Sequence, residues 1–97
     1  MEMEINKIIK IKHGRGQSML ELKIRNILDV VKSTGYIELR FWSPIDGQKK
    51  FLYLFDDEPI TWYDKDGNES TDYMKMVDTL SVYAEQTKLK DAIASLD

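Results

Sequence analysis

The sequence predicts an α+β fold: a small antiparallel sheet of about five strands with a carboxyl-terminal helix packed on one face. Three observations predict it. Apolar and charged residues alternate over residues 8–25, two apolar runs flank an Asp-Gly pair at residues 46–47, and apolar residues recur with helical spacing over residues 73–84. A chain of 97 residues suits one domain, so we expect residues 1–97 to share a single hydrophobic core.

The first predicted hairpin spans residues 8–25, whose sequence is IIKIKHGRGQSMLELKIR. Apolar and charged residues alternate on both sides of its centre, as in half-buried strands. The glycines of the HGRG centre could form an anion-binding nest, but no phosphate-loop motif is present and the next segment is predicted to be a strand. We therefore expect an ordinary hairpin loop. The expected facing pairs are Ile9 with Leu22, Lys10 with Glu21, and Ile11 with Leu20. A register shifted by two residues keeps the same faces, so the sequence leaves the loop length open.

Residues 18–34 fit three alternatives. In the favoured one, a strand ends near Arg25 and Asn26 caps a short central helix that runs through Lys32. In the second, a longer helix begins at Ser18 with a capping-box pattern and buries an apolar stripe made of Leu20, Ile24, Ile27, Leu28 and Val31. In the third, the chain forms an extended hairpin through the sequence KSTG.

The central hairpin is predicted from residues 36–42 and 49–55, which flank the loop SPIDGQ. Asp46-Gly47 indicates a two-residue turn that would pair Ile45 with Gln48. One face then carries Ile37, Leu39, Phe41, Leu52 and Leu54. The opposite face carries Tyr36, Glu38, Arg40, Trp42, Phe51, Tyr53 and Phe55.

The carboxyl-terminal part begins with a break at DDEP, residues 56–59, followed by a short strand over residues 60–64 and a turn at KDGNES. Ser70 or Thr71 would cap the helix. Its apolar stripe is expected to pack on the Ile37 face of the central hairpin through Met76, Val77, Leu80 and Ala84.

The end of this helix changes phase, because Leu89 lies about 180° around the helix from Leu80. Either the helix breaks near Thr87 or its last turns face something other than the sheet.

The first candidate site is the aromatic face of the central hairpin. Aromatic and arginine side chains are enriched in the energetic centres of protein interfaces, because they offer large rigid contact area with a polar group attached. The competing interpretation is that the first hairpin or the carboxyl-terminal helix covers this face. A chain of this size has few elements left for that, so we expect part of the set to stay exposed. The set comprises Tyr36, Arg40, Trp42, Phe51, Tyr53 and Phe55.

The second candidate site follows from uneven charge, since residues 1–55 carry a net +4 and residues 56–97 a net −7. Either the halves neutralise each other in the fold, or each meets a charged partner. The basic residues that could contact an anion or a nucleic acid are Lys10, Lys12, Arg15, Lys23 and Arg25.

The third candidate site is an acidic docking surface, for which the competing interpretation is a solvated face. It comprises Asp56, Asp57, Glu58, Asp64 and Asp66. The segment around Asp64 and Asp66 resembles the start of a calcium loop. However, Gly67 and Lys75 stand at the wrong positions for that motif, so we expect a turn.

Other chemistry is poorly supported. His13 is the only histidine and cysteine is absent, so we expect no enzyme activity, no metal and no cofactor. The composition, 42% apolar and 32% charged, is typical of a soluble globular chain, and no run approaches the length of a membrane span. The amino end lacks the pattern of a signal peptide, and the lack of cysteine fits a reducing compartment. We expect a cytoplasmic protein without membrane association.

The leading hypothesis is a non-catalytic protein-interaction module of the inhibitor or adaptor type, such as an accessory protein of a mobile element, with an unidentified protein partner. Self-association would use the aromatic face or Leu89, Ile93 and Leu96. The alternative is nucleic-acid binding by the basic hairpin face, with Trp42 and Tyr53 stacking on unpaired bases. A third hypothesis, a small enzyme or ligand carrier, requires a concave pocket lined by the aromatic face.

Overall fold

The computed structural model of the chain describes the backbone of residues 4–95 and the side chains of residues 5–89. In this part of the chain, seven strands precede one long helix, and two short 3-10 turns lie among the strands. The elements are η1 (Glu4–Asn6), β1 (Ile8–His13), β2 (Ser18–Lys23), η2 (Ile24–Asn26), β3 (Ile27–Ser33), β4 (Tyr36–Trp42), β5 (Lys49–Phe55), β6 (Ile60–Tyr63), β7 (Glu69–Ser70) and α1 (Tyr73–Ser95). The predicted α+β class is confirmed.

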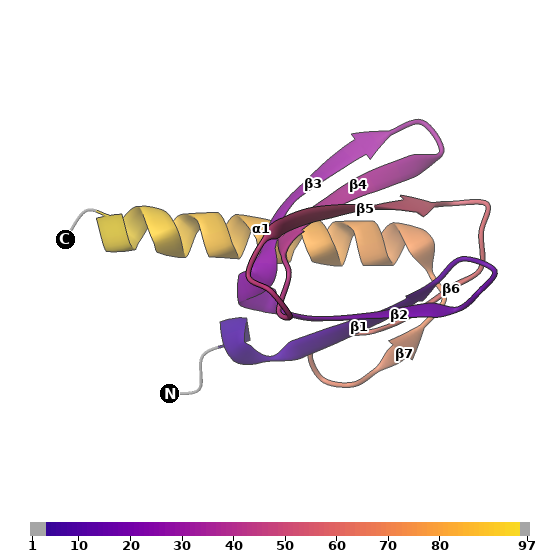
Figure 1. The fold of residues 1–97 in the computed structure, drawn as a ribbon, viewed down its shortest axis with the longest axis horizontal. Helices are drawn as coiled ribbons and strands as arrows, with labels where there is room; N and C mark the ends of the chain where they lie inside the picture. The colour runs from indigo at the N-terminus through magenta and orange to yellow at the C-terminus, as the bar shows by residue number, and fades with distance from the viewer. Residues whose placement is uncertain (1–3, 96–97) are drawn as a thin grey trace.

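The strands form two antiparallel sheets, whereas the sequence predicts one sheet of about five strands. The first sheet has the strand order β2-β1-β6-β7, and the second has the order β3-β4-β5. Figure 1 shows the second sheet above the first, with α1 crossing the view along both and its last turns extending beyond them. Within the described residues, no helix has the length and hydrophobicity needed to cross a membrane.

The first hairpin has the predicted register. Ile9 pairs with Leu22, Lys10 with Glu21, and Ile11 with Leu20. The other side of β1 pairs with β6, so the short strand predicted at residues 60–64 completes this sheet together with β7. Gly14, with a φ of 74°, lies in the connecting loop, which is the ordinary hairpin turn that the sequence predicted.

The short central helix expected over residues 26–32 is wrong, and so is the longer helix beginning at Ser18. Asn26 does accept a hydrogen bond from the backbone N–H of Lys23, at 3.1 Å, but the turn that it closes is η2, a single 3-10 turn. The chain then continues as β3, which pairs with β4 across a two-residue loop ending in Gly35 at a φ of 85°. This confirms the third alternative, the extended hairpin through KSTG. Pairing with β4 satisfies the backbone groups of β3 that face β4, and this pairing overrides the local helical spacing.

The central hairpin has the predicted faces but a longer loop. Its ladder ends at Trp42 opposite Lys49, so the expected pair of Ile45 with Gln48 is wrong. The Gly47 N–H donates to the Ser43 carbonyl at 2.9 Å, which closes a wider turn. The difference in register is two residues, and an even shift leaves every side chain on its predicted face.

α1 begins at Tyr73, later than the caps predicted at Ser70 and Thr71. Ser70 lies in β7, and the Asp72 carboxylate caps the helix by accepting a hydrogen bond from the Lys75 N–H at 3.1 Å. Two further hydrogen bonds hold this end of the helix, one to each sheet. The Trp62 Nε1 donates to the Asp72 carbonyl at 3.1 Å, and the Tyr73 hydroxyl donates to the Leu54 carbonyl at 2.7 Å.

The helix does not break near Thr87. This buried side chain donates toward the carbonyls of Tyr83, at 3.1 Å, and Ile24, at 3.3 Å, so its hydroxyl is satisfied inside the helix interface. Leu89, one turn beyond the core, is 63% exposed, which agrees with the predicted change of phase. The side chains of Ile93 and Leu96, the other residues expected to mediate self-association, lie outside the described residues.

One hydrophobic core joins α1 to both sheets. The predicted helix stripe of Met76, Val77, Leu80 and Ala84 is buried. The second sheet contributes Ile37, Leu39, Phe41 and Leu54, which confirms the predicted packing, and the first contributes Ile9, Ile11, Leu22 and Trp62. Since the inner faces of both sheets are used in this way, their outer faces are the surfaces left for binding.

Candidate interaction surface

The outer face of the second sheet carries the aromatic residues predicted as a binding site. Side chains alternate between the two faces of a strand, so the even-numbered residues of β4 and the odd-numbered residues of β5 point away from the core. We call this surface the aromatic face, and it consists of Tyr36, Arg40, Trp42, Phe51, Tyr53 and Phe55. All six predicted residues are therefore brought together.

The rings of the aromatic face contact one another. The ring centres of Tyr36 and Phe55 lie 5.5 Å apart, and Tyr36 lies at the same distance from Tyr53 in an edge-to-face arrangement. Phe51 and Tyr53 are 5.4 Å apart, again edge to face. These contacts lie in the favourable range for aromatic pairs, so the rings pack against one another on this face.

Neither the first hairpin nor α1 covers this face. Phe51 is 60% exposed, Tyr53 44%, and Trp42 and Phe55 39% each. Val31, on the neighbouring strand β3, adds a further exposed apolar side chain opposite Glu38. Exposed apolar side chains therefore lie next to one another on this outer face.

Charged groups stand among the rings. The Arg40 guanidinium is paired with Glu38, two residues before it on the same strand, and the Lys49 ammonium lies 5.5 Å from the centre of the Trp42 ring. An open hollow of about 410 Å³ lies at this end of the face, lined by Leu28, Asp29, Arg40, Lys49, Lys50 and Phe51. Only Phe51 among the aromatic residues borders it, so this hollow is not the aromatic-lined pocket that a ligand carrier would require.

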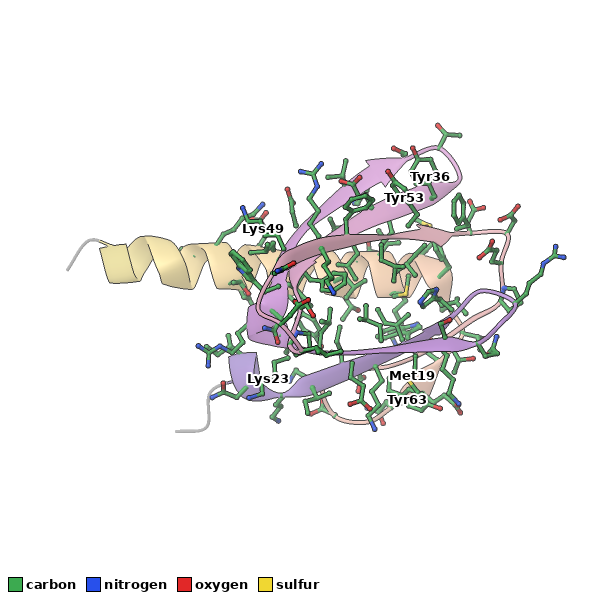
Figure 2. The ribbon with its side chains drawn as sticks, viewed as in Figure 1. Met19, Lys23, Tyr36, Lys49, Tyr53 and Tyr63 are labelled. Atoms are coloured by element: carbon green, nitrogen blue, oxygen red, sulfur yellow. The ribbon has the colours of Figure 1, made fainter. Side chains whose placement is uncertain are left out.

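The predicted basic residues lie on the opposite side of the molecule. Lys10, Lys12 and Lys23 point outward from the first sheet, while Arg15 lies in the β1–β2 loop and Arg25 in η2. Figure 2 shows the two outer faces, with Tyr36, Tyr53 and Lys49 on the upper side and Met19, Lys23 and Tyr63 on the lower side. The structure therefore places these basic residues away from the aromatic rings that were expected to stack on bases.

Some lysines on this side of the molecule form ion pairs with carboxylates. Lys7 lies 3.6 Å from Asp66, and Lys10 lies 3.8 Å from Glu21, measured between ammonium nitrogen and carboxylate oxygen. Lys12 and Lys23 have no carboxylate partner within the described residues. A hollow of about 770 Å³ on this outer face is lined by Lys7, Lys10, Lys12, Lys65, Tyr63, Asp64, Met19, Ile8, Asn6 and Gly67. Ile8 and Met19 are exposed neighbours of the lysines that the sequence analysis did not name. Ile8 lies two residues before Lys10 on the same face of β1, and Met19 faces Lys12 in the predicted register, so the pattern could have found them.

The predicted acidic surface is divided between two loops. Asp56, Asp57 and Glu58 follow β5, whereas Asp64 and Asp66 follow β6, so the strand β6 separates the groups. Asp64 forms the expected turn, because its carboxylate accepts hydrogen bonds from the backbone N–H groups of Asp66 and Asn68, each at 2.9 Å. Burial alone would raise the pKa of Asp64, but these hydrogen bonds outweigh it and lower the pKa.

Within the part of the chain that the structure describes, no three His, Cys, Asp or Glu side chains are grouped to hold a metal ion. No protein-family model, curated protein or solved structure matches the chain. The chemistry of the surfaces themselves is therefore the basis for any functional argument.

Proposed function

We propose that the chain is a non-catalytic protein-interaction module, of the inhibitor or adaptor type, which docks a protein partner on the aromatic face. The observation that carries the proposal is the exposure of ordered aromatic side chains on one outer sheet face, with Phe51 exposed the most. The absence of cysteine fits action in a reducing cytoplasm, as for an accessory protein of a mobile element.

The physical chemistry of the aromatic face favours a protein partner. Rings that are already packed lose little conformational entropy on binding, so more of the contact energy contributes to affinity. Arg40, opposite Phe51, and the Lys49 ammonium, at the end of the face beside Trp42, supply polar groups next to the apolar rings, and interfaces combine apolar contacts with polar groups in this way. Aromatic and arginine residues also dominate the energetic centres of known interfaces.

The test compares two variants of the tagged full-length chain in its native host. Phe51→Ala combined with Tyr53→Ala removes the centre of the aromatic face, and Val82→Ala, on an exposed position of α1 that is 53% accessible, is the matched control. We expect quantitative capture to identify a partner that the wild type and the control retain and the double variant loses. With purified partner, the double variant should bind about 30-fold more weakly, which corresponds to about 2 kcal/mol. Equal capture and equal affinity for all three proteins would refute the proposal.

Nucleic-acid binding is the second candidate, and the gathering of Lys10, Lys12 and Lys23 on one outer face favours it. Binding of a labelled single-stranded oligonucleotide should weaken steeply when the salt concentration is raised from about 50 to about 200 mM, because phosphate contacts release counterions. Replacing Lys12 and Lys23 by Gln should weaken it further, while the Phe51 and Tyr53 variant should bind normally, since those rings lie on the opposite side. No binding at the lower salt concentration would remove this candidate.

A further inference from the structure

The free edge of β5 lacks the protection that the other sheet edges have. Within the described residues β5 pairs only with β4, and its last five residues are FLYLF, without a charge, a proline or a bulge. Proteins normally protect such edges, because the unpaired backbone groups recruit another strand.

The other edges of the two sheets are protected. β3 has a bulge between Ile27 and Asp29, and Asp29 forms an ion pair with Lys88 of α1 at 3.2 Å. β2 carries Glu21 and Lys23, and β7 has only two residues. β5 is therefore the edge best suited to pair with a further strand.

The hydrogen-bond pattern shows which backbone groups of β5 are available. The Asp56 N–H donates to the Gly35 carbonyl at 2.9 Å, on the β4 side. Backbone groups alternate in direction along a strand, so the N–H and C=O groups of Phe51, Tyr53 and Phe55 point to the free edge. The Phe55 carbonyl accepts a long hydrogen bond of 3.4 Å from the Glu58 N–H, but a carbonyl has two lone pairs and can accept a second donor.

The charges at the two ends of β5 are complementary. The strand begins with Lys49 and Lys50 and is followed directly by Asp56 and Asp57, all of them exposed. Lys50 is paired with Asp46 at 3.1 Å, an exposed contact that contributes little to stability and can be exchanged. If a second copy of β5 runs antiparallel to the first, the acidic residues after one strand lie next to the lysines at the start of the other. The same contact occurs at both ends of the pair.

We infer that β5 pairs with β5 of a second copy of this chain, antiparallel, about a two-fold axis at Tyr53. In this register Phe51 faces Phe55 of the second copy, and Lys49 and Lys50 face its Asp57 and Asp56. The facing pairs Phe51–Phe55 and Tyr53–Tyr53 consist of residues whose backbone groups point to the free edge, so the ladder within the strands has the normal antiparallel pattern, and Asp56 and Asp57 meet the lysines from the turn that follows β5. The product is a six-stranded sheet with two copies of the aromatic face side by side.

This inference concerns the edge of β5, whereas the proposed function concerns the outer face, so each can fail without the other. An edge pairing of seven-residue strands is small beside standard protein interfaces. We therefore expect a dimer whose population rises with protein concentration.

Cysteine crosslinking tests the register, because the chain contains no cysteine of its own. In Tyr53→Cys, the two introduced residues face each other across the axis with Cα atoms about 5.5 Å apart, within the range of a disulfide. In the matched control Phe51→Cys, the two cysteines lie about 14 Å apart along the strands, although position 51 is more exposed. Under mild oxidation Tyr53→Cys should form the disulfide-linked dimer at least about tenfold faster.

Charge reversal tests the ends of the strand. One variant carries Lys49→Glu with Lys50→Glu, and the other carries Asp56→Lys with Asp57→Lys. Each variant alone sets like charges against each other and should be monomeric in sedimentation experiments at concentrations where the wild type dimerises. An equimolar mixture should form a heterodimer, because both ends are then complementary, and a misfolded variant cannot produce this rescue.

A wild-type chain that stays monomeric at every concentration would overturn the inference. Equal crosslinking at positions 51 and 53, or a mixture of the charge variants that does not associate, would also overturn it. Partner capture by the Asp56→Lys, Asp57→Lys variant separates the two proposals, because this variant keeps every residue of the aromatic face while it should not dimerise.

Discussion

At the scale of single residues, two buried polar contacts connect α1 to the sheets. Trp62 of β6 and Tyr73 at the first position of the helix each donate a hydrogen bond to a backbone carbonyl, of Asp72 and Leu54 respectively. Both side chains lie partly or fully in the core, where an indole N–H or a hydroxyl without an acceptor is costly. These contacts position the helix stripe over both inner sheet faces, which leaves the outer faces uncovered.

We predict that Tyr73→Phe lowers the free energy of unfolding by about 1 kcal/mol, because the hydrogen bond from the Tyr73 hydroxyl to the Leu54 carbonyl is lost in a partly buried site. Urea denaturation followed by circular dichroism measures the change. The control is Tyr63→Phe, which removes an exposed hydrogen bond of 2.9 Å to Glu69 and should change stability by less than about 0.5 kcal/mol. Equal effects of the two substitutions would contradict the assigned role of Tyr73.

At the scale of elements, β3 shows how pairing overrides local sequence preference. Residues 27–31 satisfy a helical apolar spacing, yet Val30 faces Leu39 of β4 and Ile27 is fully buried in a strand. The turn residues decided the outcome, since Gly35 takes the positive φ that a tight loop requires. The same hairpin gives β4 a neighbour on each side, so β5 is left at the edge of its sheet.

The β3–β4 turn gives a prediction about glycine. Gly35→Ala should destabilise the protein by about 1 kcal/mol, because an L side chain is strained at a φ of 85°. Gly16→Ala is the matched control, since Gly16 has no positive φ and a methyl group added there would meet no atom within 4 Å. Thermal unfolding of both variants measures the difference, and a control as unstable as Gly35→Ala would show that backbone strain is not the cause.

At the scale of the whole molecule, one core holds two sheets whose outer faces differ in chemistry. One outer face is aromatic and the other bears lysines that are partly neutralised by Asp66 and Glu21. The positive charge of residues 1–55 is therefore partly balanced within the fold by the negative charge of residues 56–97, through the contact of Lys7 with Asp66. Exposed ion pairs of this kind contribute little to stability, so the shared apolar core is what joins the sheets.

The shared core predicts that both sheets unfold together. Trp62 reports on the first sheet and Trp42 on the second, so the variants Trp42→Phe and Trp62→Phe each leave one fluorescent reporter. In each variant, the fluorescence transition in urea should coincide with the transition followed by circular dichroism, as in two-state unfolding. A midpoint for either tryptophan that differs from the circular dichroism midpoint of the same variant would indicate two independently stable parts.

Local sequence patterns were enough to predict the period-two strands, the faces of both hairpins and the buried stripe of α1. These features depend on the alternation of apolar and polar residues and on helical spacing, and both patterns can be recognised within a short stretch of sequence. For residues 27–33 the sequence left three alternatives open, and the structure selects the hairpin through KSTG. The division into two sheets, and the exposure of the rings around Tyr53 on the side opposite the lysines, are visible only in the tertiary structure. These outcomes depend on which strands pair across the chain, because each backbone group must find a distant partner and no short stretch of sequence specifies it.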